Sequence, residues 1–317
     1  MNYYKKLKKK IKKNKAIVCV IGLGYVGSAI IEKFDSKNFR TIGIDKDKRK
    51  FLFLRKKKMK LTTEYKFIDL ADIIIIALPT PLKNNMSPDL SYIEGCMQKI
   101  KPYLKKGQLI SLESTTYPGT TEEIILPILK KRNFTISKDF FLVYSPERIS
   151  PEIKVKNKKI KYKFHNTPKI YSGYSNQCKS LAALLYKKVT KKVVLASSLK
   201  MAETTKMIEN IFRSINIGLV NELKMFLDKV NIDINEALDL ADTKPFGFTK
   251  FSPGPGYGGH CIPLDPFYLY WLAKKNNFKL KFINTSGMVN REVVNWITNK
   301  ILKFIKTKKI KLIKKKI

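Results

Sequence analysis

The chain has 317 residues, 44% of them hydrophobic, and a formal net charge of +39 at pH 7. A chain of this length and composition can build a substantial core in one large or two ordinary domains, which excludes a disordered tail. Its uncharged apolar runs are far shorter than the roughly 20 residues needed to cross a bilayer. The lysine-rich leader at residues 1–15 is followed by a strand-like segment closed by glycines, not by a cleavable signal. We expect a soluble cytoplasmic protein without a membrane partner.

The positive charge comes almost entirely from lysine and is spread along the chain. A net charge of this size favours nucleic-acid binding. Base and phosphate recognition favours arginine, however, and the accompanying isoleucine and asparagine are typical of a genome-wide drift in composition. We therefore expect solvated lysine faces and no specific nucleic-acid partner, and keep a basic nucleic-acid-binding protein as an alternative.

The cysteines do not predict a metal site. The four cysteines lie far apart, without a CxxC pair, at Cys19, Cys96, Cys178 and Cys261. This spacing argues against both a zinc site and a disulfide scaffold. We expect no bound metal.

A dinucleotide-binding motif follows the leader. Residues 16–21 form a continuous apolar run typical of a buried strand, and GLGYVG at residues 22–27 leads into a helical pattern at 28–34. In such a GxGxxG motif the first glycine permits a tight turn, the second lets the backbone approach a pyrophosphate, and the third lets the helix pack on the strand. The predicted cofactor contacts in this motif are Gly22, Gly24, Tyr25, Val26 and Gly27.

A second strand, predicted at 40–44, ends at Asp45. A carboxylate at this position accepts hydrogen bonds from a ribose diol and repels a 2′-phosphate, so NAD is favoured over NADP. The neighbouring Lys46 and Lys48 weigh against that preference.

The next 150 residues alternate between strands and helices. Strands are predicted at 71–78, 108–113, 140–144, 169–173 and 192–195, with helices at 90–104, 121–131 and 176–188. This alternation predicts an α/β fold, a Rossmann-type doubly wound sheet over residues 16–197 whose loops after successive strands gather on one edge. Thr80, Thr115 and Glu147 should therefore converge on the cofactor crevice, although each could be only a turn residue or a helix cap. Residues 151–168 read as a basic insertion with little structure.

One long helical pattern covers residues 198–230, with apolar residues every three or four positions. Its length indicates a spine between domains or across a dimer. Lys206 and Asn210 lie four residues apart and hence on one face of this helix. We expect an all-helical central dimerisation domain over residues 198–300.

A glycine-rich loop, GPGYGGHCIPLDP at residues 254–266, sets Cys261 four residues ahead of Asp265. Glycine-dense backbone is kept where a chain turns tightly or closely approaches a ligand, so a thiol here suggests a nucleophile. The loop alone leaves open an incidental buried cysteine.

Together these stretches resemble the UDP-glucose/GDP-mannose dehydrogenase family over residues 16–300, and within it the UDP-N-acetylglucosamine 6-dehydrogenases of bacterial surface-polysaccharide synthesis. The motifs that carry the resemblance are VIGLGYVG, ALPTPL with PDLSYI, LESTTYPGTTEE, FFLVYSPER, AETTKMIENIFRSINIGLVNELK, and TKPFGF through PGPGYGGHCIPLDPFYL. The resemblance implies an NAD-dependent oxidoreductase that converts the C6 alcohol of a UDP-sugar to a carboxylate in two hydride transfers, through a thiohemiacetal and a thioester on Cys261.

The resemblance also implies roles for individual residues. Lys206 would stabilise developing negative charge on oxygen, held by Asn210; Asp265 would act with the lysine on water or proton transfer, and Glu147 would be the general acid and base of thioester hydrolysis. Gly22, Gly24, Gly27, Asp45, Thr80 and Thr115 match cofactor contacts. The implied substrate contacts are Glu147, Arg148, Lys206, Asn210, Phe251, Gly256, Gly258 and Gly259.

The chain departs from the family pattern in two places. Glu152 stands where the family has glycine after Ser-Pro-Glu-Arg-x-x-Pro. Residues 301–317 look like a remnant of a C-terminal UDP-binding domain, with 308–317 as its first strand. The resemblance implies a homodimer through the central domain, and we also expect that a separate chain could supply the UDP-binding domain. The alternative is an inactive NAD-binding or dimerisation module of the same family.

Overall fold

The computed structural model describes residues 2–54, 59–148, 153–155, 158–160, 166–258 and 263–308. The chain divides into two compact units, residues 1–206 and residues 207–317. The division falls inside the long helix rather than at 197/198, where the sequence pattern places the domain boundary.

The first unit is built on a sheet of eight strands. In spatial order these are β10 (Val193–Leu195), β9 (Lys169–Gly173), β6 (Phe141–Tyr144), β5 (Leu109–Leu112), β4 (Ile73–Ile76), β1 (Ile17–Ile21), β2 (Arg40–Ile44) and β3 (Lys60–Thr62). The strands from β3 to β6 are parallel and follow the order 3-2-1-4-5-6 of the dinucleotide-binding fold, whereas β9 is antiparallel to β6. The predicted doubly wound sheet is confirmed, and the strand order reverses between β1 and β4.

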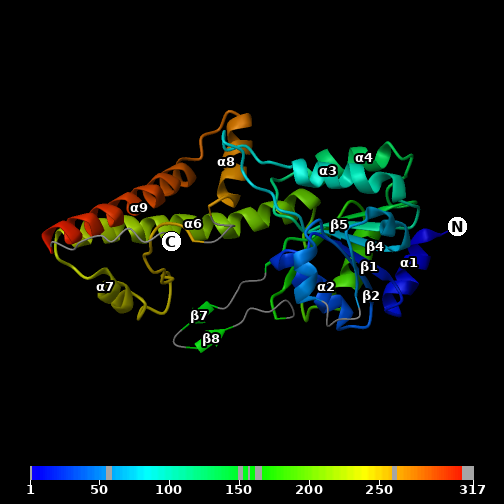
Figure 1. The fold of residues 1–317 in the computed structure, drawn as a ribbon, viewed down its shortest axis with the longest axis horizontal. Coiled ribbons are helices and arrows are strands. Elements are labelled where there is room, and N and C mark those ends of the chain that lie inside the picture. Colours follow the sequence, from blue (N-terminus) through cyan, green and yellow to red (C-terminus); the bar gives the residue numbers. More distant parts are fainter. Residues whose placement is uncertain are drawn as a thin grey trace. The chain divides into compact units, whose positions relative to one another are not determined.

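Helices cover both faces of this sheet, with α2 on one side and α3 and α4 on the other (Figure 1). The helical segments of the first unit are α1 (Tyr3–Lys12), α2 (Tyr25–Asp35), η1 (Lys48–Phe53), η2 (Tyr65–Leu70), α3 (Ser91–Ile100), η3 (Lys101–Tyr103), η4 (Thr121–Ile125), α4 (Leu126–Lys130) and α5 (Asn176–Tyr186). Alternate strand residues such as Val18, Ile73 and Phe141 join side chains of α1, α2 and α5 in one buried core. The strands are apolar on both faces because both faces are covered.

The basic leader is a packed helix. α1 buries Leu7 and Ile11 in the core, and the Lys10 ammonium lies 2.6 Å from the Asp72 carboxylate at the start of β4. Tyr3 and Tyr4 pack partly buried against the same core, and lysines occupy the other positions of the helix. The charge run is therefore the polar face of an amphipathic helix.

Parts of the predicted insertion also have structure. β7 (Ile153–Val155) and β8 (Lys158–Ile160) pair as antiparallel strands, where the sequence pattern predicts little regular structure. The remaining residues of the insertion up to 165 lie outside the described segments, Glu152 among them.

The second unit contains only helices among its described residues. α6 (Leu199–Lys229) runs into it from the first unit and is followed by α7 (Ile234–Ala241), α8 (Asp265–Lys275) and α9 (Lys281–Thr307). α9 packs along α6 through Asn221, whose side chain donates to the Asn290 side chain over 2.8 Å (Figure 1). Residues 301–307 belong to α9, so this part of the predicted C-terminal remnant is helical. The strand predicted at 308–317 lies outside the described residues apart from Lys308.

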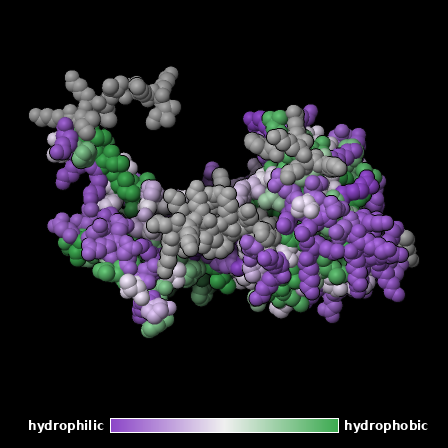
Figure 2. Space-filling view, turned by 90° about the horizontal axis from the view of Figure 1, so that it is seen from below, coloured by the Kyte–Doolittle hydropathy of each residue, from purple (hydrophilic) through white to green (hydrophobic). Residues whose placement is uncertain are grey.

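The coloured part of the face shown in Figure 2 is largely hydrophilic, with scattered hydrophobic areas. No helix in the described segments is long and apolar enough to span a membrane. The exposed apolar residues of α6 in the second unit are Ile208, Phe212, Leu219, Leu223 and Phe226.

Candidate functional site

The glycine loop between β1 and α2 has the geometry of a phosphate-binding turn. Gly22 has φ +90°, and a Cβ there would lie 2.4 Å from the Ala77 carbonyl oxygen. A Cβ on Gly27 would lie 1.8 Å from the Gly22 oxygen, so this residue permits the helix to pack against the turn. Gly24, at the N-cap of α2, faces open space with no atom within 4 Å of its Cβ position. A tight turn, an open second glycine and a helix N-terminus therefore fit a dinucleotide pyrophosphate.

Asp45 lies beside this loop at the carboxyl end of β2. Its carboxylate accepts hydrogen bonds from the Leu23 N–H over 2.7 Å and the Asp47 N–H over 2.9 Å, and the Lys50 ammonium lies 2.8 Å away. Asp45 is 6% exposed. The Asp45 carboxylate thus connects the end of β2 to the glycine loop. Its counter-ion is Lys50, a residue that the sequence pattern does not single out.

The loops after β4 and β5 are joined by hydroxyl groups. Thr80 donates its hydroxyl to the Thr115 carbonyl over 2.7 Å. Ser114 accepts from the Leu78 N–H over 2.9 Å and donates to the Leu78 carbonyl over 2.8 Å. Two predicted cofactor residues therefore lie together at the edge of the sheet where the strand order reverses.

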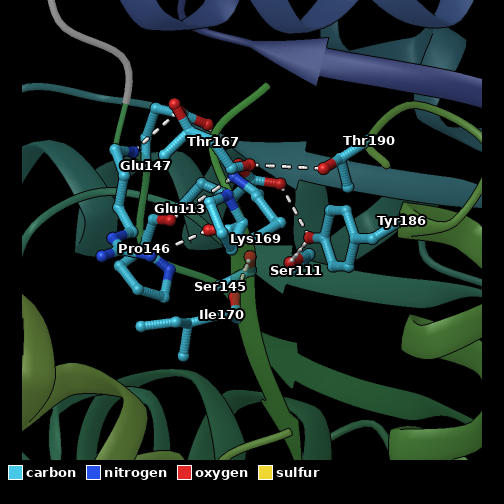
Figure 3. A network of polar contacts seen from close by, with 12 residues as sticks. Ser111, Glu113, Ser145, Pro146, Glu147, Thr167, Lys169, Ile170, Tyr186 and Thr190 are labelled. Atoms are coloured by element: carbon cyan, nitrogen blue, oxygen red, sulfur yellow. Dashed lines mark hydrogen bonds and ion pairs between the residues drawn. The ribbon is translucent and has the colours of Figure 1, made fainter. Parts of the chain in front are cut away.

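Glu147 follows β6 and belongs to a buried network of charged and hydroxyl groups (Figure 3). The Lys169 ammonium lies 2.6 Å from a Glu147 oxygen and 2.6 Å from a Glu113 oxygen. The other Glu113 oxygen accepts from the Tyr186 hydroxyl over 2.7 Å, and Tyr186 also contacts the Ser111 hydroxyl over 2.7 Å. Ser111 lies in β5 and Glu113 directly after it, and Glu147 lies in the loop after β6. Lys169 belongs to β9 and Tyr186 to α5.

Burial and charge act in opposite directions on this network. Burial disfavours the ammonium of Lys169, but the two carboxylates outweigh it and raise the pKa of Lys169. Burial raises the pKa of Glu113 against the opposing effect of Lys169, and burial followed by Glu113 raises the pKa of Tyr186 well above its usual value. Burial, followed by the charge of Glu147, raises the pKa of Tyr25.

Arg148, a predicted substrate contact, is held next to Glu147. Its backbone N–H donates to Glu147 over 2.7 Å, and its guanidinium donates to the Pro168 carbonyl over 2.9 Å. The other two loop residues of the cofactor motif, Tyr25 and Val26, are exposed and half-buried respectively.

The helical segment after the Thr115 loop is capped by a residue from α6. Glu203 accepts from the Gly119 N–H over 2.5 Å, the Thr121 N–H over 2.9 Å and the Thr121 hydroxyl over 2.6 Å. Glu203 has no exposed surface, and burial raises its pKa to about 7. The cap comes from a residue more than 80 positions away, so the local pattern that predicts a helix at 121–131 does not contain it.

In the second unit, Asn210 and Asp265 form a buried pair. The Asn210 amide donates a short hydrogen bond to the Asp265 carboxylate, and both residues are buried. Asp265 is the first residue of α8, where a carboxylate is favoured by the helix dipole. Lys206, the last residue of the first unit, is half-buried one turn before Asn210 along α6.

The loop that precedes Cys261 is anchored on α6 and α9. The Gly254 N–H donates to Asn221 over 2.9 Å, and the Tyr257 hydroxyl contacts the Ser214 hydroxyl at 2.8 Å. Gly256 has φ +80°, and its Cβ would lie 2.6 Å from the Asn290 carbonyl oxygen. Gly258 is exposed and its Cβ position is open.

Phe251, at the start of this loop, packs with its ring centroid 5.8 Å from that of Phe212, also in the second unit. The predicted residues Gly259 and Cys261 lie outside the described segments. Among the described residues no His, Cys, Asp and Glu cluster could hold a metal.

Five residues of these contacts have no role that the local sequence pattern predicts: Lys169, Glu113, Tyr186, Glu203 and Asn221. For Lys169 and Glu113 the sequence does contain a signal, because each is a charged residue within or directly after an apolar strand. The other three residues have no such signal.

The fold and the glycine loop define an NAD-binding dehydrogenase. Residues 51–190 match the NAD binding domain, and residues 200–292 the central domain, of the UDP-glucose/GDP-mannose dehydrogenase family. This chain belongs to that family, as its motifs predict, and NAD is its cofactor.

Individual relatives agree with this assignment. The chain is 36% identical over 303 residues to protein CapL of Staphylococcus aureus, an alignment that covers 90% of this chain and 69% of the relative. It is 33% identical over 304 residues to the UDP-N-acetyl-D-glucosamine 6-dehydrogenase of Salmonella typhi, with 90% and 69% covered. The solved structure of the UDP-D-ManNAc dehydrogenase of Pyrococcus horikoshii superposes with a TM-score of 0.81 at 27% identity and covers 93% of this chain and 73% of that one.

Proposed function

We propose that this chain oxidises the C6 alcohol of a UDP-N-acetylated hexosamine, UDP-N-acetylglucosamine in the first instance, to the uronic acid, in the synthesis of a surface polysaccharide. The observation that carries the proposal is the family membership together with relatives named for UDP-N-acetyl-D-glucosamine and UDP-N-acetyl-D-mannosamine. Family membership supports the class of reaction, and the names support an N-acetylated sugar.

The residues Gly22, Gly24 and Asp45, with the Thr80–Thr115 pair, hold the cofactor. NAD, when bound, accepts one hydride in each of two oxidations. In the first, the C6 carbon loses a hydride and its hydroxyl loses a proton, which leaves an aldehyde. The Cys261 thiolate then adds to the aldehyde carbon, forming a C–S bond, and the aldehyde oxygen takes up a proton to give a thiohemiacetal. In the second, the thiohemiacetal loses a hydride and a proton and becomes a thioester. Water then attacks the thioester, breaks the C–S bond, and releases the carboxylate and the thiolate.

The remaining proposed catalytic residues handle charge and protons. Lys206 stabilises the oxygen as negative charge develops in the thiohemiacetal and in the hydrolysis step, and Asn210 helps to hold it. Asp265 works with the lysine on water or proton transfer. Glu147 takes a proton from the attacking water as general base. Arg148, Phe251, Gly256, Gly258 and Gly259 are proposed substrate contacts.

The stoichiometry of the reaction tests the proposal. The 317-residue chain is incubated with UDP-N-acetylglucosamine and NAD, and in parallel with UDP-N-acetylmannosamine and UDP-glucose, while NADH is followed by absorbance and the uronic acid by mass spectrometry. The two-step scheme predicts about two NADH per sugar acid formed. Cys261→Ser should stop acid formation, and a serine variant that still completes it contradicts the role of Cys261. Cys178→Ser, at a buried cysteine of the first unit, is the matched control.

We further propose a homodimer through the second unit. The exposed apolar residues of α6, such as Phe212, Leu219 and Phe226, support a partner there. Sedimentation velocity of the wild type and of Leu219→Lys tests this: a monomer in the wild type contradicts the dimer.

Two other outcomes of the activity assay would favour the alternatives. NAD binding without turnover on any of the three sugars would favour an NAD-binding and dimerisation module. Turnover restored by a separate UDP-binding chain would support a second subunit.

A further inference from the structure

The chain is attached to one face of α6 on both sides of Cys261. Four residues before Cys261, the Tyr257 hydroxyl contacts the Ser214 hydroxyl of α6 at 2.8 Å. Four residues after Cys261, the Asp265 carboxylate accepts a hydrogen bond from the Asn210 amide of the same helix. Asn210 and Ser214 lie four positions apart, on neighbouring turns of one helix face. Two fixed points on α6 therefore flank Cys261 in the chain.

The hydroxyl groups of Tyr257 and Ser214 form a cluster with that of Ser286 on α9. The Ser286 oxygen lies 3.4 Å from each of the other two oxygens, and Ser286 donates its own hydrogen to the Ile283 carbonyl over 3.0 Å. A hydroxyl has a single hydrogen to donate, so Ser286 accepts from the other members of the cluster. The hydrogen bonds therefore run in one direction, from the tyrosine and Ser214 through Ser286 to a backbone carbonyl of α9.

This hydroxyl cluster is enclosed by its two helices. Ser214 and Ser286 are 1% and 5% exposed, and Tyr257 is half-buried. The helices approach each other closely beside it, since a Cβ on Gly218 of α6 would lie 3.2 Å from the Ser286 Cβ. Buried hydroxyl groups are costly unless they are hydrogen-bonded, which favours the arrangement in which all three are paired. The Tyr257 hydroxyl is thus held by both helices.

The backbone just before Tyr257 is held to the same helices. The Gly254 N–H donates to the Asn221 side chain over 2.9 Å, and Asn221 donates to Asn290 over 2.8 Å. Gly256 lies so close to α9 that its Cβ would be 2.6 Å from the Asn290 carbonyl oxygen. The chain therefore leaves Tyr257 toward Cys261 from a backbone that is fixed at several points.

We propose that Tyr257 is a positioning residue for Cys261, whose place relative to the substrate carbon depends on the bond between the Tyr257 and Ser214 hydroxyls. The inference rests on the proposed role of Cys261 as the nucleophile. Residues 258 and 259 are both glycine, which has no side chain to fix the backbone and permits many backbone conformations. Tyr257 is therefore the last side chain before this flexible pair that can direct the chain toward the thiol. Tyr257 itself is not assigned contact with the substrate.

The test begins with removal of the hydroxyl alone. Tyr257→Phe keeps the ring, and kinetics of the whole chain with NAD and UDP-N-acetylglucosamine should show kcat lowered about tenfold to a hundredfold, because a misplacement of about 1 Å can cause such a loss. The KM for NAD should stay at its wild-type value, since the phosphate loop and Asp45 belong to the first unit. Tyr270→Phe, on α8 in the second unit, removes a hydroxyl outside the cluster and should leave kcat unchanged.

A double variant tests whether Tyr257 acts through Ser214. Ser214→Ala should also lower kcat, and the double variant should be within about twofold of the slower single variant, because both substitutions break the same hydrogen bond. Losses that multiply in the double variant would show that the two residues act independently and would overturn the proposal. If Ser214→Ala does not fold, the isosteric Tyr257→Phe still decides.

A purely structural cluster predicts a different result. If the hydroxyl groups only joined α6 to α9, Tyr257→Phe would lower the midpoint of thermal unfolding and leave kcat at its wild-type value at temperatures well below that midpoint. Wild-type kcat in Tyr257→Phe therefore overturns the positioning role, whatever the midpoint, and leaves the proposed function intact.

Hydrogen exchange tests the attachment without turnover. In Tyr257→Phe, peptides that contain residues 254–258 should exchange their amide hydrogens about tenfold faster than in the wild type, while peptides of α7 keep their wild-type rates. Unchanged exchange at 254–258 overturns the proposal. A wild-type chain that does not turn over any of the sugars would contradict the proposed function, while the exchange rates would still decide whether Tyr257 fixes this loop.

Discussion

The carboxylate of Glu203 accepts two hydrogen bonds from Thr121, one from its backbone N–H over 2.9 Å and one from its hydroxyl over 2.6 Å. With a third bond from the Gly119 N–H, a side chain of α6 satisfies the free donors at the start of the helical segment η4–α4. Free N–H groups at a helix start need such a partner when they are buried.

Removal of this cap should destabilise the first unit. Glu203→Ala leaves three buried donors without their acceptor, and we expect the free energy of unfolding in urea to fall by about 2–4 kcal/mol. Glu222→Ala, at an exposed glutamate of the same helix, should change it by less than about 0.5 kcal/mol. Equal losses in the two variants would contradict the capping role.

The same carboxylate predicts a pH dependence. Burial raises the pKa of Glu203 to about 7, above that of an unfolded glutamate, so protonation favours the folded state. The contribution is fully present below the unfolded pKa of about 4.3 and is lost as the pH rises through about 7. The wild type should therefore gain about 1–3 kcal/mol relative to Glu203→Gln when the pH is lowered from 8 to 5, measured by urea unfolding at each pH. A difference independent of pH would be inconsistent with a raised pKa.

The two glycines of the phosphate loop should respond differently to alanine. Gly27→Ala places a Cβ 1.8 Å from the Gly22 oxygen, and we expect a lower melting temperature together with weaker NAD binding. Gly24→Ala meets no protein atom within 4 Å, so its melting temperature should match the wild type while NAD binding weakens at least about tenfold, since the methyl group occupies space that the pyrophosphate approaches. Calorimetric titration with NAD and thermal unfolding of both variants check this. Unchanged NAD affinity in Gly24→Ala would rule out the assigned phosphate site.

Asp45 and Lys50 make a prediction about cofactor choice. The Asp45 carboxylate should repel a 2′-phosphate, and Asp45→Ala both removes it and releases Lys50, which lies 2.8 Å away. We expect Asp45→Ala to lose affinity for NAD and to bind NADP about tenfold better relative to NAD than the wild type does. Lys50→Met in the Asp45→Ala background should abolish this gain, measured by fluorescence titration with both dinucleotides. A gain in relative NADP binding that survives in the double variant would show that Lys50 does not supply it.

Gly256 and Gly258 form a similar matched pair in the second unit. Gly256 has φ +80° and its Cβ would lie 2.6 Å from the Asn290 oxygen, whereas the Cβ position of Gly258 is open. Gly256→Ala should destabilise the second unit by about 1–3 kcal/mol, and Gly258→Ala should unfold at the wild-type midpoint. If the proposed substrate contact is right, Gly258→Ala still raises the KM for the UDP-sugar. Wild-type stability in Gly256→Ala would mean that the loop does not need this conformation.

Most of the sheet could be predicted from local patterns. Nearly continuous apolar runs predict β1, β4, β5 and β6 within one or two residues of their observed bounds, because strands buried on both faces are apolar at most positions. The glycine loop was recognisable since each glycine meets a local steric requirement. α1 was not expected to be a packed helix, because a run of lysines hides the spacing of Leu7 and Ile11.

The sequence by itself determined the class of fold, the family and the cofactor, since these depend on residues close together in the chain: a strand, a glycine turn, a helix and an acidic strand end. Only the tertiary structure decided which distant residues complete these parts. Lys169 joins Glu113 to Glu147, Glu203 caps the segment at Thr121, and Lys50 pairs with Asp45. The local sequence around a lysine in an apolar strand does not predict which residues it will contact. Its partners are set by the sheet topology, which brings the ends of β5, β6 and β9 together. Burial of an ammonium between two carboxylates is therefore a property of the fold.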